Sequence, residues 1–116
     1  MTIESNNFVL FLMGPTASGK TELAIKISKI IDSTLISVDS ALIYKGMDIG
    51  TAKPDKETLI NFPHELIDIC NPEDSFSVTE FITLAKKHIN TALNKGKLPI
   101  LVGGTSFYFN ALEHGL

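Results

Sequence analysis

The chain has 116 residues, of which 44% are hydrophobic and 20% are charged, and its formal net charge is −3. This length fits one domain rather than two, and this apolar content argues against a disordered chain. All ten basic residues are Lys and none is Arg. A net negative chain without Arg does not coat nucleic acid generally, although a local binding site stays possible.

The single cysteine and the first apolar run bear on the compartment. Cys70 has no second cysteine to pair with, which fits a reducing environment. The apolar run at residues 8–13 is too short for the core of a signal peptide or for a membrane span, and no basic residue precedes it. We therefore expect a cytoplasmic protein that does not associate with membranes.

The first half of the chain alternates between strand and helix patterns. Residues 8–13 form a continuous apolar run that ends in glycine, which predicts a strand buried on both faces. Apolar residues at helical spacing predict a helix over 20–31, and a β-branched run predicts a strand over 34–38. Residues 40–64 contain two glycines and two prolines, which indicates loop with a short helix over 55–61.

The second half continues the alternation. We expect a short strand over 65–69, then a helix to about Lys95 that a Ser77–Glu80 capping box opens and Gly96 ends. A strand over 98–102 and a helical start through Leu112 follow. The pattern is typical of βαβ units, so we expect one α/β domain over residues 1–116 with a parallel sheet flanked by helices. Because the chain stops after an apolar helical segment, we expect a truncated protein or an excised domain.

A phosphate-binding motif joins the first strand to the first helix. It follows the pattern G-x-x-x-x-G-K-[ST] and consists of Gly14, Pro15, Thr16, Ala17, Ser18, Gly19, Lys20 and Thr21. The glycines let backbone N–H groups converge on a phosphate, and the helix directs its positive dipole end at the anion. Lys20 would neutralise phosphate oxygens, and the Thr21 hydroxyl would bind Mg²⁺. The motif refines the expected fold to a P-loop NTPase-like sheet. A plain glycine turn is the alternative.

Asp39 comes directly after the second predicted strand. In parallel sheets ligands lie at the carboxyl ends of the strands, so we expect this carboxylate to face the phosphate loop. It could be a metal-associated acid of the Walker B kind or a general base. Alternatively, Asp39 and Ser40 could cap a turn.

Gly103, Gly104 and Thr105 follow the third strong strand and fall at the same edge. Glycines there permit close approach of the backbone, and the Thr105 hydroxyl could bond to an oxygen near the phosphates. A strand-to-helix turn with Thr105 as its N-cap is the alternative, and both can hold together.

The stretch from Asp39 to Pro54, taken with the phosphate loop, is distinctive. The sequence DSALIYKGMDIGTAKP closely resembles the signature of the tRNA dimethylallyltransferases, also called isopentenyl-tRNA transferases. The segments at 63–68, 76–81 and 101–105 follow in that family's order and spacing, so the resemblance covers essentially the whole chain. Glu65 and the pair Ser106–Phe107 depart from the family's usual residues. Family members are also much longer, with further regions that embrace the tRNA and carry arginines.

The resemblance implies transfer of a dimethylallyl group from dimethylallyl diphosphate to the exocyclic amine of an adenosine beside the tRNA anticodon. The phosphate loop and Mg²⁺ would then hold the pyrophosphate leaving group. Asp39 matches the family's base position, and Lys20 and Thr105 match positions near the reacting groups. The residues that match the stretch meeting the flipped-out base are Asp39, Ser40, Ala41 and Leu42, and Thr105 could join them.

Two other functions stay open. A small-molecule or nucleotide kinase uses the same loop, but such kinases usually carry a lid with Arg, which this chain lacks. A non-catalytic module is the third possibility. For the chain alone we expect diphosphate binding without turnover, and self-association through apolar surface around Phe107, Phe109 and Leu112.

Overall fold

The structure is a computed structural model, which describes residues 8–14, 19–39, 41–46 and 53–103. In chain order its elements are β1 (Leu10–Met13), α1 (Lys20–Ile30), β2 (Ser33–Ser37), α2 (Lys56–Asn61), β3 (His64–Glu65), α3 (Val78–Asn94) and β4 (Leu98–Gly103). The strands form one sheet in the order β1-β4-β2-β3, and every pair is parallel. The expected parallel sheet flanked by helices is confirmed.

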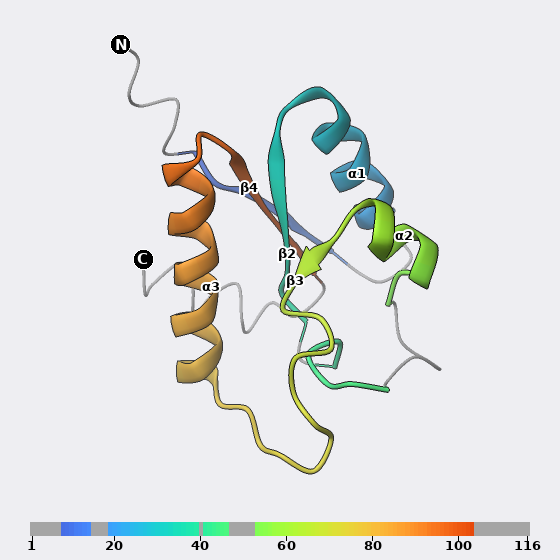
Figure 1. Cartoon of the computed structure of the whole chain (residues 1–116), viewed down its shortest axis with the longest axis vertical. Helices are drawn as coiled ribbons and strands as arrows, with labels where there is room; N and C mark the ends of the chain where they lie inside the picture. The colour runs from blue at the N-terminus through green and yellow to red at the C-terminus, as the bar shows by residue number, and fades with distance from the viewer. Residues whose placement is uncertain (1–7, 15–18, 40, 47–52, 104–116) are drawn as a thin grey trace.

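The helices cover the two faces of this sheet. Figure 1 shows α3 along one face, with α1 and α2 on the other. Helix α3 presents Phe81, Ala85, Ile89 and Ala92 inward at intervals of four, four and three residues, which is the spacing of one helical face. Phe81 and Ala85 pack with Ile36 and Leu101 in the larger core cluster.

The opposite face has a smaller core. Ala24 of α1 packs against Leu35 of β2 and against Ile100 and Val102 of β4. Because side chains alternate along a strand, Leu35 faces α1 and the next residue faces α3, so strand β2 is buried on both faces. The continuous apolar runs of the sequence are explained by this double burial.

Most predicted boundaries agree with the structure to within two residues. The exception is the strand predicted over 65–69, because β3 begins one residue earlier and ends at Glu65. Leu66 and Asp68 both have positive φ, at 68° and 57°, a conformation that does not continue a strand. The helical start predicted beyond Gly104 lies outside the described residues.

Candidate functional site at the carboxyl ends of the strands

Three strands end side by side where the sequence motifs lie. The Gly14 N–H, just after β1, donates to the Gly103 carbonyl of β4 over 3.4 Å, and the Val38 N–H, just after β2, donates to the Val102 carbonyl over 2.8 Å. Strand β4 therefore lies between the phosphate loop and the turn that carries Asp39. Strands are about 4.8 Å apart, so the loop strand and the Asp39 strand are about 10 Å apart.

The start of α1 is built without a side-chain cap. Gly19 is its N-cap residue, with φ 76° and ψ 21°, and this glycine has no side chain that could cap the helix. A Cβ at Gly19 would meet nothing within 4 Å, so the glycine serves the left-handed backbone conformation rather than a lack of space. Lys20 is the first residue of the helix. Pro15, Thr16, Ala17 and Ser18 of the motif lie outside the described residues.

Thr21 is the residue on which a metal site would depend. It is half-buried and precedes the buried Ala24 by three positions, so both side chains lie on the helix face that turns toward the sheet. Within the described ranges, no group of three His, Cys, Asp or Glu side chains could hold a metal ion. A single hydroxyl at a phosphate site nonetheless fits Mg²⁺, which usually keeps waters and binds through phosphate oxygens and few protein ligands.

The Asp39 carboxylate caps the turn that follows β2. Its Oδ1 accepts hydrogen bonds from the backbone N–H groups of Ala41, at 2.8 Å, and Leu42, at 3.3 Å. The sequence analysis gave this capping role as an alternative for Asp39, and these two hydrogen bonds also fix the position of the carboxylate. Ala41 is half-buried and Leu42 is 6% exposed. Ser40, the remaining residue of the predicted RNA-contacting stretch, lies outside the described residues.

Position 103 must be glycine because the backbone at Val38, just after β2, lies directly against it. A Cβ placed on it would stand 1.9 Å from the Val38 carbonyl oxygen, a distance that no side chain can adopt. The sequence suggested that this glycine admits a ligand, whereas the structure shows that it admits the backbone of β2. Gly104 and Thr105 lie outside the described residues, so the role of Thr105 stays a prediction.

The structure adds an ion pair that sequence reasoning missed. The Lys53 ammonium binds Asp68 Oδ1, and the Lys53 side chain is only 5% exposed. The two residues are 15 positions apart, and no spacing rule connects them. Asp68 lies beside the Asp39 turn, because its N–H donates to the Leu42 carbonyl over 3.0 Å.

His64 is a second group that the sequence did not single out. Its Nδ1 lies 2.8 Å from the Phe62 carbonyl, and its buried Nε2 has no hydrogen-bond partner among the residues that the structure describes. Burial lowers the pKa of His64, and the bond to Phe62 opposes that shift in part. The ring is therefore neutral near pH 7.

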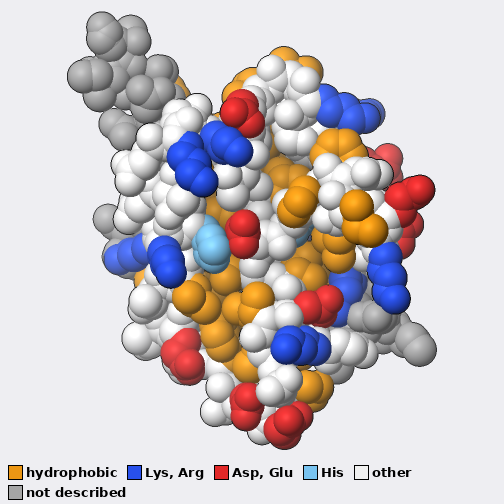
Figure 2. Space-filling view, in the orientation of Figure 1, with side chains coloured by type: hydrophobic (Ala, Val, Ile, Leu, Met, Phe, Trp, Pro, Cys, Tyr) orange, Lys and Arg blue, Asp and Glu red, His pale blue; other side chains and the backbone are white. Residues whose placement is uncertain are grey.

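A cavity of about 670 Å³ opens on the α3 side of the sheet, away from the phosphate loop. Figure 2 shows apolar side chains gathered on this face, with acidic side chains and a histidine around them. Among the described residues, the charged or titratable side chains other than Cys70 that line the cavity are Glu65, Asp74, Glu80 and His88, and no Lys lines it. Burial raises the pKa of the Cys70 thiol in this cavity, and the carboxylates of Asp74 and Glu80 add to the shift. An anionic diphosphate would be repelled here, so the edge with the phosphate loop is the better candidate for the site.

Comparison with known sequences shows the family of the chain. The sequence model of the IPP transferase family matches residues 42–116. The chain belongs to this family. It is 68% identical over all 116 residues to the tRNA dimethylallyltransferase of Vesicomyosocius okutanii, and it spans 38% of that protein's length. No helix in the described part of the chain is long and apolar enough to cross a membrane.

Solved structures of family members share the fold. The full-length tRNA isopentenylpyrophosphate transferase of Bacillus halodurans matches 95% of this chain with a TM-score of 0.88 and 44% identity. A eukaryotic dimethylallyltransferase acting on tRNA matches 90% of it with a TM-score of 0.83 and 29% identity. The chain covers 36% and 26% of those two proteins, respectively.

Proposed function

We propose that this chain is the diphosphate-binding part of an enzyme that transfers a dimethylallyl group from dimethylallyl diphosphate to the exocyclic amine of an adenosine next to the tRNA anticodon. Membership of the IPP transferase family supports this proposal. The observation that carries it is the placement of an uncapped helix start and an ordered carboxylate at one edge of the sheet, with a single strand between them. Because tRNA is the acceptor, we place this activity in the cytoplasm.

The first turn of α1 and the preceding loop would bind the diphosphate. Lys20 and the backbone N–H groups at this helix start stabilise the negative charge that grows on the leaving pyrophosphate. The residues assigned to this site are Gly14, Pro15, Thr16, Ala17, Ser18, Gly19, Lys20 and Thr21. Magnesium, held by the Thr21 hydroxyl and the phosphates, would supply further positive charge to the same oxygens.

Asp39 would act as the general base. One strand separates β2, which Asp39 follows, from β1, which leads into the loop, so the two strands are about 10 Å apart. This separation suits an acceptor amine that attacks the far end of a prenyl diphosphate bound in the loop. Among the described residues, the hydrogen bonds to this carboxylate end on Oδ1. Oδ2 is therefore the oxygen that we assign to the amine proton.

Recognition of the target base is assigned to the turn after β2. Asp39, Ser40, Ala41 and Leu42 would line the position of the flipped-out adenine, and Thr105 would contact either the leaving oxygen or the nucleic acid. The chain alone is expected to bind dimethylallyl diphosphate with Mg²⁺ without modifying tRNA. Its net charge of −3 and lack of Arg provide little of the positive surface that holds RNA.

The test uses a chimaera in which this chain replaces the 116 residues that it matches in the Vesicomyosocius okutanii relative. Asp39→Asn in the chimaera should lower kcat for tRNA prenylation by about 10²–10⁴-fold, while calorimetry gives a Kd for dimethylallyl diphosphate within about threefold of the parent. Asp32→Asn, before the start of β2 at the opposite edge of the sheet, is the matched control and should change neither quantity.

Three other outcomes would each replace the proposal with a different one. Loss of diphosphate affinity with normal turnover at saturation would make Asp39 a metal-associated acid. A lower melting temperature with intact kinetics would leave it only the cap of its turn. Protection of the chain against thermal unfolding by ATP and not by dimethylallyl diphosphate would favour a kinase.

A further inference from the structure

A continuous set of hydrogen bonds connects Asp39 to the ammonium of Lys53. Asp39 Oδ1 accepts from the Leu42 N–H over 3.3 Å. The Leu42 carbonyl accepts from the Asp68 N–H over 3.0 Å. The Asp68 carboxylate accepts from Lys53 Nζ. The carboxylate assigned as the base is thus tied through two backbone segments to an ion pair from another part of the chain.

The segment that holds Asp68 is fixed to the Asp39 turn by more than one bond. The Ile69 and Cys70 N–H groups donate to the Ile43 carbonyl over 2.9 and 3.1 Å, and the Lys45 N–H donates to the Cys70 carbonyl over 2.8 Å. These bonds join the two segments as a short parallel ladder beyond β2 and β3. A displacement of Asp68 would therefore displace the turn that Asp39 caps.

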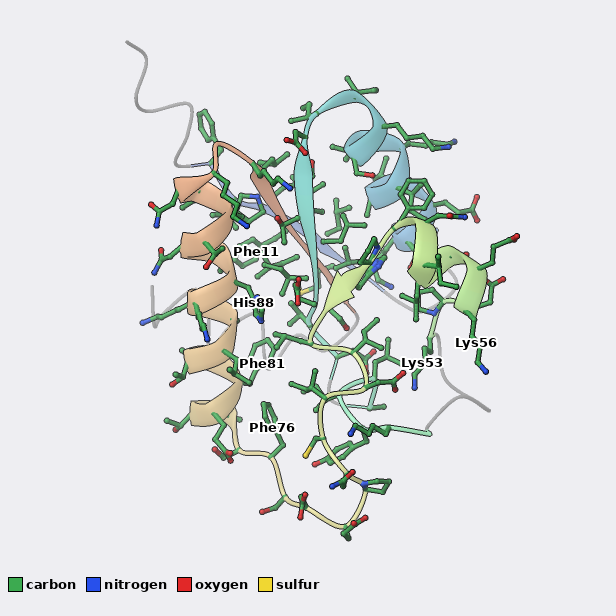
Figure 3. The ribbon with its side chains drawn as sticks, in the orientation of Figure 1. Phe11, Lys53, Lys56, Phe76, Phe81 and His88 are labelled. Carbon is green, nitrogen blue, oxygen red and sulfur yellow. The ribbon has the colours of Figure 1, made fainter. Side chains whose placement is uncertain are left out.

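Asp68 adopts a backbone conformation that is uncommon for residues other than glycine. Its φ is 57°, and Leu66, two residues earlier, has φ 68° and is 2% exposed. Left-handed conformations of residues other than glycine persist where the surroundings hold them. Lys53, labelled in Figure 3, helps to hold this conformation together with the backbone bonds above, since its side chain is 5% exposed and its ammonium bonds to the Asp68 carboxylate.

We infer that Lys53 and Asp68 are positioning residues for the reaction: they set the Asp39 turn so that the carboxylate faces the acceptor amine. This rests on the proposed function, because Asp39 must be the base for its position to affect turnover. Lys53 and Asp68 are not among the residues that we assign to the diphosphate site. Its loss should therefore change the rate of the chemical step rather than the binding of the prenyl donor.

The kinetic test uses the same chimaera with Lys53→Met, which keeps the buried aliphatic stem and removes the charge, and with Asp68→Asn, which keeps the size and tolerates positive φ. Each should lower kcat on the order of 10- to 100-fold, with the Kd for dimethylallyl diphosphate within about threefold. The double variant should lose no more than either single one, because both remove the same contact. Lys97→Met is the control: its ion pair with Asp32, at 4.0 Å, lies at the opposite edge of the sheet.

A second measurement uses the 116-residue chain and needs no catalysis. Hydrogen exchange of the Leu42 and Asp68 amides should quicken about tenfold or more in both variants, with exchange in α3 unchanged. Faster exchange with an unchanged kcat would reduce the pair to a structural contact, and unchanged exchange would overturn the inference outright. If the parent chimaera transfers no prenyl group, the proposed function fails, and the exchange data alone decide whether the pair holds the Asp39 turn.

Discussion

The first turns of α1 and α3 begin in opposite ways. Helix α3 starts with a complete capping box: the Glu80 N–H donates to Ser77 Oγ over 3.1 Å, and the Ser77 N–H donates to the Glu80 carboxylate over 3.0 Å. Helix α1 starts at a glycine in the left-handed region and receives no side-chain cap. Every helix begins with N–H groups that have no partner within the helix. The Ser77 hydroxyl satisfies one of these groups in α3, whereas Gly19, the N-cap residue of α1, has no side chain that could do so.

The difference teaches which helix end is available to an anion. Placing a carboxylate in the first turn, as Glu80 does in α3, supplies the negative charge that the helix dipole favours. Helix α1 also carries a carboxylate, Glu22, in its first turn, but Gly19 offers no side chain that could complete a capping box with it. The first residue of α1 is Lys20, so the helix dipole and this ammonium both favour an external anion at the start of α1. Three substitutions would break or sharpen this contrast, from the largest expected effect to the smallest, and a pH profile of stability follows them.

Gly19→Asp should abolish the contrast by putting a carboxylate at the start of α1. Aspartate tolerates positive φ, and a Cβ at this position meets nothing within 4 Å, so the fold should persist. Pyrophosphate affinity should fall on the order of 100-fold because like charges would meet at close range at the start of the helix. Calorimetry measures the loss. Gly19→Asn, equal in size and neutral, should lose far less, and equal losses in the two variants would show that charge is not the cause.

Lys20→Ala should weaken pyrophosphate binding on the order of 10- to 100-fold, because a charge-assisted hydrogen bond is worth about 1.5–3 kcal/mol. Circular dichroism should show an intact fold. Lys26→Ala, on the exposed side of the same helix, is the control for overall charge and should bind as the parent does. A folded Lys20→Ala chain with parental affinity would remove Lys20 from the site.

Ser77→Ala should lower the stability of the chain by about 1 kcal/mol, or about 4 °C in melting temperature, and leave pyrophosphate affinity unchanged. Thermal unfolding and calorimetry on the same preparation check both parts. A drop in affinity together with stability would mean that the start of α3 also takes part in binding. That result would contradict the assignment of the anion site to α1.

Stability should fall as pH drops below about 6.5, with His64 as the cause. Burial lowers the pKa of folded His64 from 6.5, so the unfolded chain takes up the proton first and is favoured as pH falls toward the folded pKa. Denaturant unfolding between pH 7.5 and 5 measures the effect. His64→Asn should flatten this part of the profile, and His88→Asn should retain it. A flat parental profile would contradict the assignment.

Much of the fold could be predicted because local rules and burial agree. The Ser77–Glu80 pattern predicted the start of α3, and Gly96, with φ 73°, ends that helix as predicted. The strand over 65–69 was predicted wrongly because a short, mainly apolar run does not reveal the positive φ of Leu66 and Asp68. Those conformations depend on contacts with distant segments.

The site divides in the same way. Gly19 and Lys20 could be assigned from one contiguous motif, because that chemistry is local to a strand, a loop and a helix start. The Lys53–Asp68 pair could not, since it joins segments that only the tertiary structure brings together. The reason for Gly103 was also hidden: its neighbour is the Val38 carbonyl of an adjacent strand, and a sequence does not show strand order.

The most direct test of the account is a titration of the isotope-labelled 116-residue chain with dimethylallyl diphosphate and Mg²⁺, followed by backbone amide resonances. If the start of α1 binds the diphosphate, the resonances of Gly19 and of the first turn of α1 should shift saturably, while those of the first turn of α3 and of the acidic cavity should not change. Shifts centred on residues 78–81 or on the cavity, or no saturable change at millimolar ligand, would contradict the assignment of α1 as the diphosphate site.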